Sequence, residues 1–275
     1  MSAPCPTVRI GGIGFRERPG TGLPLPYRAF AGEGATDVEI TVHRRPFAGD
    51  PPQETLFDAR PNWWLGRCDE ALWFRTMTAD ALWDRQRGSI GLHPRRSADS
   101  GGITFFSYPL AELVTLSLLA ERGGLLLHAC GVLAAGRVLL FAGPSGAGKS
   151  TMARLWRHRG YDILSDDRII LRTGNGSVTA LGTPWHGDAG SASPAGATAA
   201  ACFFLGHGAA HRATVLSPAA GAAELVRNSF SPYWDRDGME RLLASVETIS
   251  GLLPCYRLDF TPAADIVDAV LEVLA

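Results

Sequence analysis

Gly143-Pro144-Ser145-Gly146-Ala147-Gly148-Lys149-Ser150 is the stretch that decides how this chain folds, and it matches the phosphate-binding pattern G-x-x-x-x-G-K-[ST]. The apolar residues 137–142 before it predict a buried strand, and residues 151–157 after it continue at helical spacing. In this strand–loop–helix order the glycines let backbone N–H groups converge on an anion, and the helix N-terminus adds partial positive charge. The sequence therefore predicts a nucleotide site.

The phosphate-binding pattern predicts roles for the last residues of the loop. Lys149 is expected to reach the β- and γ-phosphates, and the Ser150 hydroxyl is expected to bind Mg²⁺. The expected cofactor-binding residues are Gly143, Pro144, Ser145, Gly146, Ala147, Gly148, Lys149, Ser150 and Thr151.

Composition narrows the class of protein. The 275 residues are 46% hydrophobic and 19% charged, which is typical of a globular chain with a sizeable core. The formal net charge of -1 gives no basic field for nucleic acid, so no nucleic-acid partner is expected. The five cysteines form no C-x-x-C pair, and residues 1–20 hold no apolar signal segment. We expect reduced thiols, a cytoplasmic protein and no membrane partner.

The chain divides into two expected regions. Residues 1–106 read as β-rich: Val38, Ile40 and Val42 alternate with polar residues, and 103–106 also suggests a strand. The tryptophans of this region are expected in its core, the alternative being a peptide-binding groove. The function of residues 1–106 is open, and substrate recognition is one interpretation.

Residues 107–275 mix helices and strands. A helix is expected over 110–122 and a hairpin from 125–133 and 137–142, next to the loop. The small-residue segment 189–200 shows no pattern and is expected to be mobile. Ser217-Pro218 and Thr261-Pro262 are expected to start helices. Hairpins beside the phosphate loop indicate an α/β fold with a mixed sheet instead of a purely alternating one.

Acidic residues follow the next strand. Asp166-Asp167 come where residues 161–164 end, and ligands gather at the carboxyl ends of strands. One carboxylate could bind Mg²⁺ and the other could take the proton from an attacking hydroxyl; a solvated turn is the alternative. His128 is either a core histidine or a functional one. Asp188 is either a further metal ligand or part of a structural turn.

These stretches together resemble a known family. Residues 127–132, 136–150 and 164–168 resemble the catalytic core of HPr kinase/phosphorylase, and more closely the HPr-kinase-like proteins found beside clusters for ribosomally made peptides, including lasso-peptide kinases. The resemblance covers roughly 125–181. It implies the mixed sheet shared with phosphoenolpyruvate carboxykinase, with ATP and Mg²⁺ as cofactors.

The resemblance also implies site roles. His128, Lys149, Asp166 and Asp167 would be catalytic, with Asp167 favoured as the general base. Ser150, Asp166 and Asp188 would hold the metal, Asp188 replacing the glutamate of a Glu-x-Arg-Gly-Leu-Gly signature that this chain lacks. That signature is tied to phosphorylase activity, so its loss favours a kinase alone.

The sequence thus predicts an ATP- and Mg²⁺-dependent kinase of a serine-type hydroxyl on a ribosomally made peptide or small protein. Two alternatives stay open: a nucleotide-binding regulatory module without transfer activity, and a small-molecule hydroxyl kinase. The acceptor and the oligomeric state are open, and a homo-oligomer is compatible with the resemblance.

Overall fold

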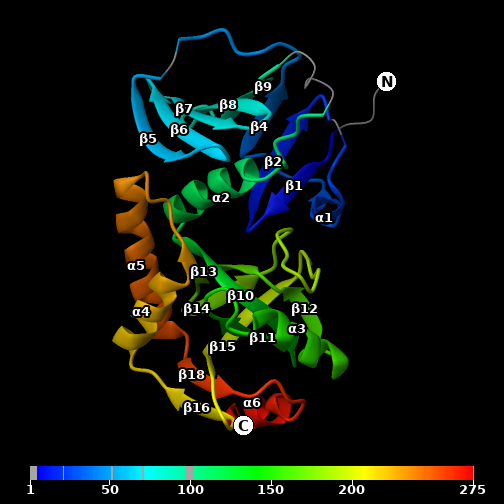
Figure 1. The fold of residues 1–275 in the computed structure, drawn as a ribbon, viewed down its shortest axis with the longest axis vertical. Coiled ribbons are helices and arrows are strands. Elements are labelled where there is room, and N and C mark those ends of the chain that lie inside the picture. The colour runs from blue at the N-terminus through cyan, green and yellow to red at the C-terminus, as the bar shows by residue number, and fades with distance from the viewer. Residues whose placement is uncertain (1–4, 21, 51, 70, 97–101, 275) are drawn as a thin grey trace. The chain divides into compact units, whose positions relative to one another are not determined.

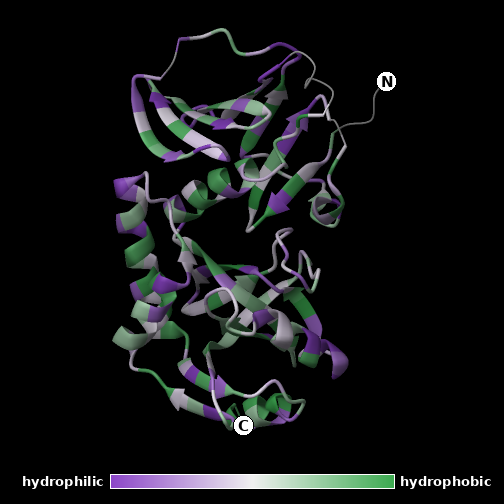
Figure 2. Cartoon of the chain, in the orientation of Figure 1, coloured by the Kyte–Doolittle hydropathy of each residue, from purple (hydrophilic) through white to green (hydrophobic). Residues whose placement is uncertain are grey.

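The computed structural model describes residues 5–20, 22–50, 52–69, 71–96 and 102–274. Its internal contacts divide the chain into two compact units, residues 1–115 and 116–275. The division falls inside α2 (Leu110–Glu121), whereas the sequence suggested a boundary at 106/107, just before this helix. α2 is hydrophobic over most of its length, as Figure 2 shows, and nearly all of its residues are buried.

The described part of the first unit is built on a nine-stranded mixed sheet in the order β3-β1-β2-β4-β9-β8-β7-β6-β5 (Figure 1). β2, β4 and β9 run parallel to one another, and the remaining neighbours are antiparallel. Its elements are β1 (Thr7–Ile10), β2 (Ile13–Arg18), α1 (Leu25–Arg28), β3 (Ala31–Gly32), β4 (Val38–Val42), β5 (Glu54–Ala59), β6 (Trp63–Cys68), β7 (Ala71–Thr76), β8 (Ala79–Asp84) and β9 (Ser89–Pro94).

The expected alternation in β4 is confirmed: Val38, Ile40 and Val42 are buried, while the residues between them are exposed. Trp73 and Trp83 are buried as expected of core residues, whereas Trp63 and Trp64 are only half-buried.

The expected strand over 103–106 is wrong. This segment is irregular, and the backbone N–H of Phe105 donates to Glu17 Oε2 at 2.6 Å instead of to a neighbouring strand. The Phe105 ring packs on Phe15 with the ring centroids 5.4 Å apart. The apolar residues that suggested a strand are therefore buried as part of a loop and not of a strand.

The second unit holds a second nine-stranded mixed sheet. Its main path is β11-β10-β13-β14-β15-β18-β16; β12 and β17 pair with β10, and β11 also pairs with β15. Its elements are β10 (Gly124–Ala134), β11 (Arg137–Ala142), α3 (Lys149–His158), β12 (Asp162–Ser165), β13 (Arg168–Gly174), β14 (Ser177–Leu181), β15 (Gly196–His207), β16 (Arg212–Val215), α4 (Pro218–Arg227), β17 (Ser229–Phe230), α5 (Arg236–Leu252), β18 (Cys255–Phe260) and α6 (Ile266–Val273).

Helices cover both faces of this sheet. Residues alternate along β11, so that Leu140 belongs to the core formed with α4 and α5, whereas Phe141 belongs to the core formed with α3 and α6. Trp156 of α3 is fully buried against Phe141, with ring centroids 5.6 Å apart. The expected mixed α/β architecture is confirmed, and β10 and β11 form the expected hairpin.

Two element boundaries differ from the expectations. The last five residues of the segment expected to be mobile, 196–200, belong to β15, which begins at Gly196 and pairs with β14 through Leu181. Of residues 196–200 only Ala199 is buried, so this part of the strand carries no clear hydrophobic pattern. The last helix begins at Ile266 after Asp265, so Thr261-Pro262 is not its start. Ser217 does cap α4, accepting from the N–H of Ala220 at 3.3 Å.

Among the described residues, no helix combines the length and the apolar character needed to cross a membrane. All five cysteines are free thiols, in agreement with the expectation of reduced cysteines.

Candidate active site

The site forms around the middle of β10, which lies between β11 and β13. Up to His128 this strand pairs with β13, and from Ala129 onward it pairs with β11. The N–H of Gly143 donates to the His128 carbonyl at 3.4 Å, and the N–H of Ala129 donates to the Asp167 carbonyl at 3.0 Å. Two consecutive residues of one strand therefore hold the start of the phosphate loop on one edge of β10 and the second acid of the Asp-Asp pair on the other.

The loop between β11 and α3 has the backbone that its glycines allow. Gly148 has a φ of 106°, and a Cβ placed on it would lie 2.6 Å from Cζ of Phe260. A side chain there would be strained by the backbone conformation and would collide with a buried ring. Gly148 is also the N-cap of α3, and its lack of a side chain leaves the first N–H groups of that helix without a side-chain cap. Such a helix end can receive an anion.

Lys149 lies folded against this loop. Its ammonium Nζ donates to the carbonyls of Gly143 at 2.8 Å and Pro144 at 2.9 Å, and the residue is almost fully buried. Burial lowers the pKa of Lys149, and the negative charge of Asp167 opposes that shift only in part. A phosphate that replaced the two carbonyls would give the ammonium a charged partner.

Asp167 is held from both sides. His128 Nε2 lies 3.1 Å from Oδ1, and Arg168 Nη1 lies 2.8 Å from Oδ2. Because a carboxylate only accepts, Nε2 of His128 is the donor in this bond. Burial acts to raise the pKa of Asp167, but the His128 hydrogen bond and the charges of Arg168, His128 and Lys149 outweigh it and lower that pKa. Asp167 is therefore ionised at neutral pH.

Asp166 has a different environment. It is 1% exposed, and its carboxylate accepts three backbone N–H groups, from Gly187 at 3.1 Å, Ala189 at 2.7 Å and Ser191 at 3.1 Å. These bonds fix the loop that carries Asp188. A metal-binding or catalytic role of Asp166 stays a prediction; its visible contacts are those of a residue that shapes a loop.

A pocket of about 390 Å³ brings the expected groups together. Its lining includes His128, Ser145, Gly146, Gly148, Lys149, Ser150, Thr151, Asp167, Gly187 and Asp188. The pocket is thus lined by six of the nine expected cofactor-binding residues, one acid of the pair, the histidine and the acid of the following loop.

The metal ligands stay a prediction. The described residues contain no group of three or more His, Cys, Asp or Glu side chains arranged to hold a metal. Mg²⁺ does not need such a group, because it keeps several waters and takes phosphate oxygens of the substrate beside one or two protein oxygens. The Ser150 hydroxyl and the Asp188 carboxylate in this pocket are oxygen donors of the required kind.

Sequence reasoning missed two supports of the site. Ser165, fully buried, accepts from the N–H groups of Asp167 at 3.2 Å and Arg168 at 3.1 Å and donates to the Trp185 carbonyl at 2.9 Å. A serine just before two acids is typical of such a turn, so this signal was available. Phe230, which lies under the Arg168 guanidinium at 4.7 Å, had no sequence signal.

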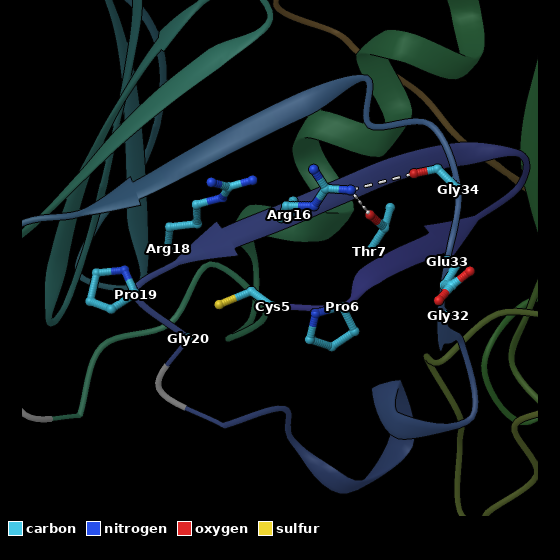
Figure 3. A pocket seen from close by; sticks show the side chains of 10 residues that line it. All are labelled: Cys5, Pro6, Thr7, Arg16, Arg18, Pro19, Gly20, Gly32, Glu33 and Gly34. Atoms are coloured by element: carbon cyan, nitrogen blue, oxygen red, sulfur yellow. Dashed lines mark hydrogen bonds between the residues drawn. The ribbon is translucent and has the colours of Figure 1, made fainter. Parts of the chain in front are cut away.

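A larger pocket, of about 1080 Å³, lies within the first unit and contains none of the expected site residues. Figure 3 shows Arg16 in this pocket bonded to Thr7 and to the Gly34 carbonyl. Arg16 Nη1 also lies 3.3 Å from the Glu39 carboxylate, and Arg18 Nε lies 3.6 Å from it. The arginines of this pocket are thus already paired with a carboxylate, which leaves little positive charge for an anionic ligand.

No protein-family model matches this chain, and neither does any curated protein sequence. Among solved structures, the Hpr(Ser) kinase/phosphatase from Coxiella burnetii is similar to it with 11% sequence identity and a TM-score of 0.32. The similarity covers 54% of this chain and 94% of that one. The assignment of the site rests on its own geometry.

Proposed function

We propose that this chain is an ATP- and Mg²⁺-dependent kinase that phosphorylates a serine-type hydroxyl on a ribosomally made peptide or a small protein. The observation that carries the proposal is the placement of an ionised Asp167 in the same pocket as Lys149 and Ser150. A phosphate loop alone would support only nucleotide binding. A carboxylate beside it gives the acceptor hydroxyl a partner within the same space.

In the proposed reaction the acceptor oxygen attacks the γ-phosphorus, the bond from that phosphorus to the β–γ bridging oxygen breaks, and ADP leaves. The hydroxyl proton passes to Asp167. Because His128 and Arg168 lower the pKa of Asp167, this carboxylate is a weak base. It acts mainly by orienting the hydroxyl and accepts the proton late, as suits a loose transition state.

The other residues supply charge stabilisation. Lys149 would exchange its bonds with the Gly143 and Pro144 carbonyls for bonds with phosphate oxygens. Ser150 and Asp188 would hold Mg²⁺, which neutralises the charge that develops on the phosphates. The N-terminal end of α3 would add its partial positive charge.

The test is to incubate the protein with γ-labelled ATP, Mg²⁺ and candidate precursor peptides, and to locate any phosphate by mass spectrometry. Lys149→Ala should abolish transfer, because it removes the cation from the phosphate site. Nucleotide binding with no transfer to any hydroxyl acceptor would favour the regulatory-module alternative. Transfer to free hydroxy amino acids, with peptides inert, would favour a small-molecule kinase.

A further inference from the structure

Two histidines of the first unit lie against each other on neighbouring strands. β4 and β9 are parallel, Val42 pairs with Leu92, and the N–H of His43 continues this ladder to the Leu92 carbonyl at 2.8 Å. The next residues, His43 and His93, have their rings stacked with centroids 4.0 Å apart and planes 4° from parallel. Neither residue has a part in the proposed kinase site.

The hydrogen bond of His93 fixes which of its nitrogens carries a proton. Nδ1 lies 3.2 Å from the carbonyl oxygen of Arg45, which can only accept, so Nδ1 is protonated. In the neutral ring Nε2 then holds the free lone pair. A backbone carbonyl on one nitrogen is the support that metal-binding histidines commonly have on the nitrogen that does not bind the metal.

The surroundings of His93 favour its neutral form over the protonated one. Its burial lowers its pKa, and the neighbouring His43 acts in the same direction; the Arg45 carbonyl and Asp80 act against them without reversing the shift. Asp80 is already engaged, accepting from Trp73 Nε1 at 2.8 Å and from Arg75 Nε at 2.7 Å.

Both Nε2 atoms border the same small space. Gly91, two residues before His93 on β9, has no side chain, and a Cβ placed on it would lie 3.3 Å from Nε2 of His93 and 3.5 Å from Nε2 of His43. The missing side chain of Gly91 therefore leaves room next to two imidazole nitrogens.

We propose that His43 and His93 form a two-nitrogen site for a divalent transition-metal ion such as Zn²⁺, Ni²⁺ or Cu²⁺, with water completing the coordination. Imidazole nitrogens suit these metals, at about 2.0–2.1 Å for zinc. The stacked rings close on the ion by tilting about χ2, a broad torsion in histidine. No larger group of metal-binding side chains gathers in the described residues, so the site is an exchangeable one and not a closed structural centre.

The experiment is a titration of the metal-free, full-length protein with Zn²⁺ by calorimetry, and with Cu²⁺ by electron paramagnetic resonance. His43→Ala and His93→Ala should each weaken the binding at one site per chain by about tenfold or more, because each removes a ligand. The Cu²⁺ spectrum of the wild type should show two nitrogen ligands. His207→Ala, which removes an exposed histidine of β15, is the matched control and should bind as the wild type does.

Gly91→Ala provides a second variant that keeps both histidines and places a methyl group in the space between them. We expect it to fold, since the contacts it creates are tight but not impossible, and to lose affinity for Zn²⁺. Wild-type affinity in both histidine variants, or in Gly91→Ala, would overturn the proposal.

Discussion

The pocket of the first unit and the pocket at the phosphate loop differ in size and in chemistry, and the smaller one is the better candidate for a reaction. The pocket of about 1080 Å³ in the first unit has arginines that are paired with Glu39 and with neutral oxygens. The pocket of about 390 Å³ in the second unit combines a buried lysine, an ionised carboxylate and a helix N-terminus. Charged groups with shifted pKa values that converge on one space identify a reactive site better than volume does.

The origin of the difference lies in the strands. In the first unit β1 to β4 keep regular neighbours, so polar side chains on one face of the sheet meet partners across adjacent strands, as Arg16 meets Glu39. In the second unit β10 lies between β13, which it pairs with up to His128, and β11, which it pairs with from Ala129 onward, so the loop after β11 and the turn before β13 start at the same level of the strand. Loops that start at the same level of neighbouring strands can bring their functional groups to one ligand.

After the complete loss expected of Lys149→Ala, the largest effect is expected from Asp167→Asn. The substitution keeps the shape of the side chain and removes the charge that would receive the proton, so phosphoryl transfer should fall by about 10²–10⁴-fold. ATP affinity, measured by calorimetry, should change little, because Lys149 and the loop remain. Equal turnover of the variant and the wild type would show that Asp167 has no part in the reaction. The smaller pocket would then lose the carboxylate that makes it the better candidate for a reactive site.

Asp166→Asn should affect folding more than chemistry. One acceptor oxygen becomes an NH₂ group that faces backbone donors, and some of the N–H groups of Gly187, Ala189 and Ser191 lose their partner. We expect a loss of about 1–3 kcal/mol in the free energy of unfolding, measured with urea. If the variant instead keeps full stability but requires far more Mg²⁺ for turnover, Asp166 is a metal ligand and not a loop support.

A smaller effect is expected from pH. In the folded protein the pKa of Asp167 lies below its ordinary value of 3.8, so its ionised form stabilises the fold at any pH above that value. This stabilisation should be lost as the pH falls through the folded pKa, below about pH 4. The difference in unfolding free energy between the wild type and Asp167→Asn should therefore be constant from pH 5 to 7 and should shrink in more acidic buffer. A constant difference down to pH 2.5 would contradict the lowered pKa.

The sequence predicted those parts of the site that depend on local pattern. The strand, the glycine loop and α3 are contiguous, and the hairpin of β10 and β11 placed His128 beside the loop. The different environments of Asp166 and Asp167 could not be predicted, because the amides that bind Asp166 come from 187–191, well separated in sequence. The start of β15 was missed for a similar reason, since its small residues are explained only by the strands next to it.

The smallest expected effect is that of Arg18→Ala in the larger pocket. The Arg18 side chain is 61% exposed and its contact with Glu39 is 3.6 Å long, so the ion pair is well screened by solvent. Stability should change by less than about 0.5 kcal/mol, and peptide phosphorylation should stay at the wild-type rate. Glu39→Gln, which removes the partner carboxylate, is the matched variant and should also leave turnover unchanged.

One result would contradict this expectation and also assign a role to the larger pocket. If Arg18→Ala raised the KM for a peptide acceptor several-fold but left ATP affinity and the hydrolysis of ATP by water unchanged, the larger pocket would bind the acceptor. The arginines would then have to exchange Glu39 for an acidic group of the peptide, and Glu39→Gln should lower the same KM by freeing them. Opposite shifts in the two variants would show that the first unit selects the substrate on which the second unit acts, whereas two neutral variants leave all of the chemistry at the phosphate loop.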